Sequence, residues 1–124
     1  MLDLGMLYLG AAFTALWGIA HLFPTRNVVK GFGEISSDNR RIITMEWIVE
    51  GVSLIFIGVL VAMVTIIDPT NSVSTAVYLL SALGLLVLAM VSLFTGFKIK
   101  FLPFRLCPVI FTVSAILIVI GGLL

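Results

Sequence analysis

The sequence predicts an all-α membrane protein, an antiparallel bundle of four transmembrane helices with both termini extracytoplasmic. Only 10% of the 124 residues are charged and 61% are hydrophobic, whereas a soluble domain carries roughly 25% charged residues. Four apolar segments, residues 4–23, 42–67, 73–97 and roughly 101–124, stand out along the chain. All seven Lys and Arg residues lie in two of the loops between them.

Each apolar segment is at least 20 residues long, which suffices to cross a hydrocarbon core of about 30 Å as a helix rising about 1.5 Å per residue. Only helices cross as single segments, because lipid offers the backbone no hydrogen-bond partners. A chain of this length is expected to form one domain, residues 1–124. Cap and helix-breaking residues mark the segment ends: Asp3, Pro24, Ser36, Asp68, Pro69, Asn71, Pro103 and Pro108.

The first segment is interpreted as a permanent helix rather than a secretory signal. Met1, Leu2 and Asp3 carry no positive side chain, and the apolar run that follows is too long for a signal core. The basic residues then predict the orientation, because cytoplasmic loops are enriched in Lys and Arg. The first and third loops are expected in the cytoplasm, since they hold Arg26, Lys30, Arg40, Arg41, Lys98, Lys100 and Arg105.

Small residues recur within the spans and favour close helix packing. These residues are Gly5, Gly10, Gly18, Gly51, Gly58, Ser81, Gly84, Ser92, Ser114 and Gly121.

The composition also excludes several function classes. The single cysteine, Cys107, rules out an internal disulfide or a two-thiol redox centre, and a net charge of +1 gives no basic face for nucleic acid.

Three ionisable residues lie within the spans: His21, Glu46 and Glu50. The predicted topology places all three in the cytoplasmic half of the bundle. Glu46 and Glu50 are four residues apart and share one helix face. Glu50 is the deeper carboxylate, and a charged side chain in the middle of a span costs about 2.5–3.5 kcal/mol. Such a residue usually faces the bundle interior and marks a function.

Two interpretations of this cluster stay open. In the first, the three residues lock the first helix to the second, and Trp17 and Trp47 are ordinary interfacial anchors. In the second, they form a ligand or proton-handling site. A metal site is disfavoured, because the Glu-x-x-His pairing of carboxylate bundles is absent. The candidate ligand-binding residues are Thr14, Trp17, His21, Glu46, Trp47, Glu50 and Ser53.

Two stretches resemble the DoxX-like family of small four-span membrane proteins. They are residues 18–24 (GIAHLFP), at the end of the first helix, and residues 50–58 (EGVSLIFIG), a Glu-Gly opening followed by an apolar run to a glycine. The length and number of spans are also similar. The resemblance implies membrane redox chemistry, because some family members are subunits of a thiosulfate–quinone oxidoreductase. By position, it indicates His21 and Glu50 as functional residues.

We therefore expect a multi-pass protein of a prokaryotic inner membrane that binds a quinone-like or lipid-like ligand. Quinone is the candidate cofactor, and the chain is accessory to redox chemistry because its one cysteine cannot run a dithiol reaction. Membrane lipids, oxidoreductase subunits or further copies of the chain are the expected partners. The alternative is a structural or assembly subunit. A proton pathway is disfavoured, since the outer halves of the helices offer no ionisable residue.

Overall fold

The computed structural model describes residues 2–124, and the described part of the chain is helical, without a strand. Four of its helices are long and apolar enough to cross a membrane. The predicted all-α, four-span fold is therefore confirmed, and it indicates a small integral membrane protein. The helices are α1 (Leu2–Leu22), α2 (Thr25–Lys30), α3 (Ser37–Ile67), α4 (Ser72–Gly96) and α5 (Leu102–Leu123).

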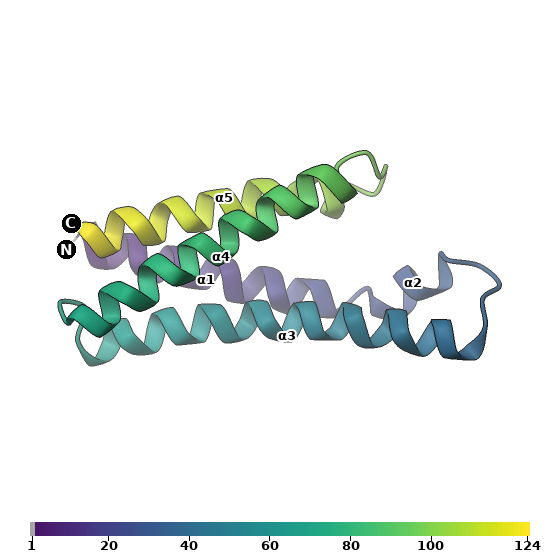
Figure 1. Cartoon of the computed structure of the whole chain (residues 1–124), viewed down its shortest axis with the longest axis horizontal. Coiled ribbons are helices and arrows are strands. Elements are labelled where there is room, and N and C mark those ends of the chain that lie inside the picture. Colours follow the sequence, from purple (N-terminus) through teal and green to yellow (C-terminus); the bar gives the residue numbers. More distant parts are fainter. Residues whose placement is uncertain (1) are drawn as a thin grey trace.

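The four long helices form an antiparallel bundle (Figure 1). Helix α1 packs against α3 and α5, and α4 packs against α5, whereas α3 and α4 touch much less. The two ends of the chain lie together at one end of the bundle, beside the short turn between α3 and α4 (Figure 1). The other end carries the α1–α3 and α4–α5 connections.

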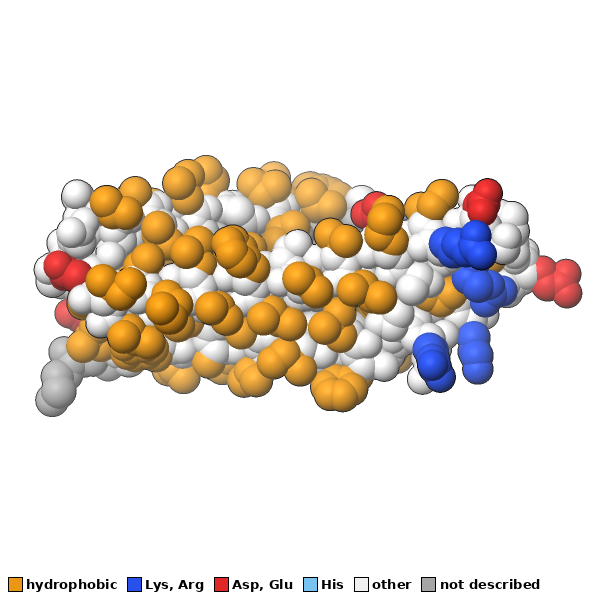
Figure 2. All heavy atoms as spheres, turned by 90° about the horizontal axis from the view of Figure 1, so that it is seen from below, with side chains coloured by type: hydrophobic (Ala, Val, Ile, Leu, Met, Phe, Trp, Pro, Cys, Tyr) orange, Lys and Arg blue, Asp and Glu red, His pale blue; other side chains and the backbone are white. Residues whose placement is uncertain are grey.

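Lys and Arg side chains gather at one end of the molecule in Figure 2, while hydrophobic side chains are spread along its body and some acidic side chains lie at the opposite end. We call this end the basic end; it comprises the two connections 23–36 and 97–101, the first turns of α3 and the start of α5. The apolar surface is what lipid contact requires. The separation of charge from the apolar surface follows from the clustering of all basic residues in two stretches of the sequence, residues 26–41 and 98–105.

The helix bounds differ from the predicted ones mainly at the basic end. Helix α3 begins at Ser37 rather than at residue 42, because the Ser36 side chain accepts a hydrogen bond from the Asn39 backbone N–H at 3.1 Å and caps it. Its 31 residues extend about 46 Å, longer than a hydrocarbon core of about 30 Å. The short helix α2 was not predicted, because six residues show no periodicity that distinguishes them from a loop.

Glycines allow the close approach of α1 and α3. A Cβ atom on Gly18 would lie 2.6 Å from the Gly51 carbonyl oxygen, and one on Gly58 would lie 2.6 Å from the Ala11 carbonyl oxygen. Not every small residue has this role: a Cβ on Gly84 would meet no described atom within 4 Å. The same holds for Gly5. The α1–α3 contact therefore has a fixed spacing, and this spacing positions the site described below.

A buried hydrogen bond joins α3 to α4 at the end away from the basic end. The hydroxyl oxygens of Thr65 and Tyr78 are 2.9 Å apart, and both residues are buried. The Ser74 hydroxyl also donates to the Asp68 carbonyl oxygen at 2.6 Å. These bonds lie next to the four-residue connection between the helices. Helices α3 and α4 are thus held together at one end and separate toward the other.

Replacing Thr65 with valine is expected to lower the free energy of unfolding by about 1–3 kcal/mol, because the buried Tyr78 hydroxyl loses its partner. Thr75→Val is the matched control, since the Thr75 hydroxyl donates only to Asn71 of its own helix. Unfolding in mixed detergent measures both variants. Equal stabilities would show that the Thr65–Tyr78 bond does not hold the two helices together.

Candidate functional site

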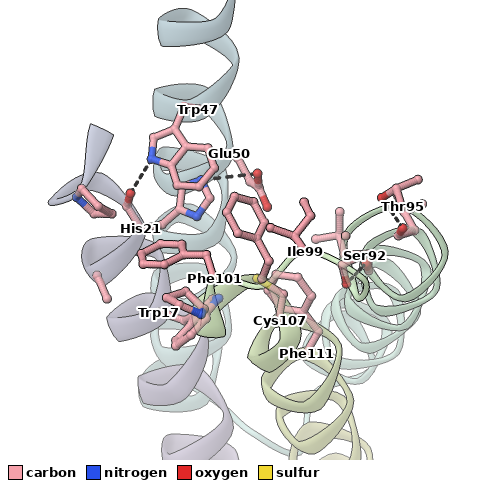
Figure 3. A pocket seen from close by; sticks show the side chains of 17 residues that line it. Trp17, His21, Trp47, Glu50, Ser92, Thr95, Ile99, Phe101, Cys107 and Phe111 are labelled. Atoms are coloured by element: carbon pink, nitrogen blue, oxygen red, sulfur yellow. Dashed lines mark hydrogen bonds and ion pairs between the residues drawn. The ribbon is translucent and has the colours of Figure 1, made fainter. Parts of the chain in front are cut away.

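A cavity of about 450 Å³ lies inside the bundle near the basic end (Figure 3). All four long helices contribute to its wall. Helix α1 provides Trp17 and His21, and α3 provides Trp47 and Glu50. Helix α4 and the α4–α5 connection provide Leu88, Val91, Ser92, Thr95 and Ile99, and the start of α5 provides Phe101, Pro103, Phe104, Cys107 and Phe111.

His21 and Glu50 meet at this cavity. Their Nε2 and Oε2 atoms are 3.3 Å apart. The two residues come from opposite sides of the α1–α3 contact, which Gly18 and Gly51 bring close together. Depth and helix phase predicted that they could be in reach of one another, and the structure brings them together.

Trp47 holds His21 in place through two further contacts. The two rings stack with centroids 3.8 Å apart and an angle of 17° between their planes. The Trp47 indole N–H donates to the His21 carbonyl oxygen at 2.7 Å. That carbonyl belongs to the last turn of α1, where backbone oxygens lack partners within the helix. Trp47 therefore fixes both the ring and the backbone of His21.

His21 is 9% exposed, and its Nε2 atom has no hydrogen-bond partner among the described residues. The approach to Glu50 brings the two atoms near each other without the angles of a hydrogen bond. A buried polar atom without a partner is unusual and needs an explanation. His21 is thus a buried polar residue of the cavity wall whose Nε2 atom lacks an aligned partner.

A chain of aromatic rings lines the cavity on its side toward the basic end. From the His21–Trp47 stack it continues to Phe104, whose ring centroid is 5.6 Å from that of Trp47. It ends at Phe101, whose ring centroid is 5.9 Å from that of Phe104. The Trp47–Phe104 contact joins α3 to α5 across the hollow. We call these four rings the aromatic cap. Offset and tilted pairs at such distances attract one another, so the cap is a cohesive structure.

The opposite wall carries hydroxyl groups on α4. The Ser92 hydroxyl donates to the Leu88 carbonyl oxygen at 2.8 Å, and the Thr95 hydroxyl donates to that of Val91 at 2.6 Å. Their oxygen lone pairs remain able to accept hydrogen bonds. In Figure 3 these two side chains lie on the far side of the cavity from His21 and Glu50. The cavity thus has polar groups on two walls and apolar or aromatic groups between them.

A second hollow of about 440 Å³ runs along α3 on its side toward α4. We call it the α3 groove. Its lining includes Glu46 and Ser53, neither of which lines the cavity. It shares three residues with the cavity, namely Trp47, Glu50 and Leu88.

The seven candidate residues are therefore divided. Trp17, His21, Trp47 and Glu50 line the cavity, while Glu46 and Ser53 lie in the α3 groove. Thr14 belongs to neither hollow: it is fully buried, and its hydroxyl donates to the Gly10 carbonyl oxygen at 2.8 Å. Thr14 shares a helix stripe with Trp17 and His21, but deeper in the bundle that stripe is packed rather than open.

The walls from α4 and α5 were not among the candidate residues. Phe104, Cys107 and Phe111 lie three and four residues apart, the spacing that places side chains on one helix face. This periodicity was the available signal. Ser92 gave none beyond its small size, since serine in a span is ordinary for helix packing.

Aromatic and aliphatic side chains surround the cavity, and few polar groups converge in it, as in many small-molecule sites. Among the described residues, no three His, Cys, Asp or Glu side chains gather as metal ligands.

Comparison of the chain with protein-family models, with curated proteins and with solved structures finds no match.

Proposed function

We propose that this chain binds a quinone-like or lipid-like molecule in the cavity and is accessory to membrane redox chemistry. The positive-inside rule favours an orientation with the basic end in the cytoplasm and both termini outside. The ligand head then lies in the cytoplasmic leaflet of a prokaryotic inner membrane. The resemblance of residues 18–24 and 50–58 to the DoxX-like family supports the same proposal, since both stretches reach the cavity wall through His21 and Glu50.

One observation carries the proposal: the unpartnered His21 Nε2 beside Glu50, in a cavity otherwise lined mainly by aromatic and aliphatic groups. A bundle that needed only stable packing would fill this space, because unfilled volume lowers stability. A polar ligand head that reaches Nε2 would satisfy the buried nitrogen and fill the space at once.

The charges around the cavity favour an uncharged head. Among the described residues that line it, none is Lys or Arg, the side chains that bind phosphate most strongly. A phospholipid head would also meet the Glu50 carboxylate. A quinone-like ring has oxygen atoms that accept hydrogen bonds and no charge, so it fits this wall better than a phosphate does.

His21 and Glu50 would act on the proton chemistry of such a ring. Reduction of a quinone to a quinol takes up two electrons and two protons. The imidazole can pass a proton to a ring oxygen, with Glu50 as its neighbour in the relay. The electrons would come from an oxidoreductase subunit, and that subunit would bind the exposed apolar surface within the membrane.

A structural role is the second candidate, and the Trp47 contacts favour it. The ring stack and the hydrogen bond to the His21 carbonyl oxygen join α1 to α3 whether or not a ligand is present. In that case the chain would be an assembly subunit or a homo-oligomer, and the polar residues would only fix helix packing.

The two tryptophans of the chain provide a direct test, because Trp17 and Trp47 both line the cavity. We expect a benzoquinone with a ten-carbon tail to quench their fluorescence saturably, at one equivalent per chain, in phosphatidylcholine nanodiscs. Quenching that rises linearly with the quinone content of the bilayer would indicate random collisions and would contradict the proposal.

A further inference from the structure

We propose that the ligand enters the cavity sideways from the bilayer, between α3 and α4, and that its tail stays in the α3 groove. This inference rests on the proposed function, because it needs a ligand head in the cavity. It assigns the groove to a single apolar chain attached to that head. It also assigns Leu88 to the neck between the two hollows.

The first support is the continuity of the two hollows. Trp47, Glu50 and Leu88 line both of them. Trp47 and Glu50 come from α3 and Leu88 from α4, so the shared residues lie where these two helices face each other. A molecule with its head beside Glu50 can therefore extend past Leu88 into the groove without crossing the wall of a helix.

The second support is the packing of the bundle. Helices α3 and α4 have the weakest contact of the neighbouring long helices. The Thr65–Tyr78 bond and the short connection after α3 hold them together away from the basic end. In Figure 1, α4 runs obliquely across the bundle and departs from α3 toward the basic end. Residues of α3 and α4 line both hollows, so the hollows meet where these two helices diverge.

The third support is the aromatic cap, which lies on the alternative route from water. Phe104 reaches across to Trp47 at the basic end, and Phe101 packs against Phe104. A head entering from the aqueous side would have to separate these rings. A ligand that enters from the bilayer between α3 and α4 leaves them in place.

The groove suits a tail rather than a second head. Its floor is mostly aliphatic, with Val49, Leu54 and Leu88 among its residues. Among the described residues that line it, none is basic, so it offers no partner for a phosphate. The groove runs along α3 from Ile42 near the basic end to Leu54. Its part beyond Glu50, at Ser53, lies one turn deeper, so a tail that takes this direction runs toward the middle of the bilayer, where an apolar chain is most soluble.

The test fills the groove without touching the cavity. Ser53→Phe places a ring in the path of the tail; Ser53 is exposed on α3 and lines only the groove, so the fold tolerates the change. Val52→Phe is the matched control, because Val52 is 52% exposed and lines neither hollow. The probes are the ten-carbon-tailed benzoquinone and the same ring without a tail, both titrated by tryptophan quenching.

We expect Ser53→Phe to raise the dissociation constant of the tailed probe about tenfold, as steric overpacking of a filled site does. The tailless probe should bind this variant as it binds the unchanged chain, and Val52→Phe should bind both probes normally. Ser53→Leu, a smaller obstruction, should give an intermediate loss for the tailed probe only.

Two results would overturn the inference, and they are distinguishable. If both probes bind the unchanged chain saturably and Ser53→Phe weakens neither, or weakens both equally, the tail does not lie in the groove although the cavity binds the ring. If neither probe binds the unchanged chain saturably, the proposed function fails and the inference fails with it.

Discussion

Replacing Glu50 with glutamine is expected to weaken binding of the tailed benzoquinone at least about tenfold. The Glu50 charge beside the imidazole strengthens the hydrogen bond that His21 donates to a ring oxygen, and hydrogen bonds that involve a charged group contribute about 1.5–3 kcal/mol. Glutamine keeps the size of the side chain but removes the charge beside His21 Nε2, 3.3 Å away. The ring then loses a partner for proton exchange and the imidazole loses its acidic neighbour. Tryptophan quenching in nanodiscs measures the change.

The thermal stability of Glu50→Gln should not fall along with its ligand binding, and this difference separates the two candidate functions. A carboxylate within a span costs about 2.5–3.5 kcal/mol, so the neutral Glu50→Gln variant should unfold at the same temperature as the unchanged chain or a higher one. A packing clamp predicts the reverse, a lower melting temperature with no effect on any ligand. Asp38→Asn is the control: it removes a carboxylate that lies outside both hollows and forms only an exposed pair with Arg41.

The largest loss of stability is expected from Gly58→Ala. The added Cβ would lie 2.6 Å from the Ala11 carbonyl oxygen and 2.7 Å from the Ala15 Cβ, and neither neighbour can rotate away. Helices α1 and α3 must separate to admit the methyl group, which typically costs about 1–3 kcal/mol. Because His21 and Glu50 meet across the same helix pair, ligand binding should weaken as well.

Gly84→Ala is the matched control for that substitution. It makes the same chemical change within a transmembrane helix, but its Cβ would have no described atom within 4 Å. Alanine is favoured over glycine in helices by about 1 kcal/mol, so this variant should be as stable as the unchanged chain or more stable. Unfolding in mixed detergent measures both variants. Equal stability of the two would mean that α1 and α3 do not approach each other this closely.

The sequence was sufficient for the four spans because each is an apolar run of fixed minimum length, which depends only on local composition. It also placed His21 near Glu50, since both lie close to the same end of adjacent helices. It could not separate Glu46 from Glu50. Their shared face is real, but α3 presents one side of that face to the cavity and the other to the groove, and this depends on its rotation.

Thr14 is a second residue whose position could not be predicted from the local pattern. Its stripe on α1 continues to Trp17 and His21, so helix periodicity grouped the three. The bundle is closed at the depth of Thr14 and open at that of His21, because α4 departs from α3 only toward the basic end. Likewise, the position of Phe101 and Phe104 over the cavity depends on how the α4–α5 connection folds back. Helix divergence and loop path are tertiary properties that a local pattern does not contain.

The most direct test of ligand binding is native mass spectrometry of the chain purified in mild detergent, with extracted molecules identified. We expect one uncharged, ring-headed, tailed molecule per chain, retained by the unchanged protein and lost from Glu50→Gln. Bare protein, or protein that carries only bulk phospholipids that Glu50→Gln leaves unchanged, would contradict it and favour the packing role.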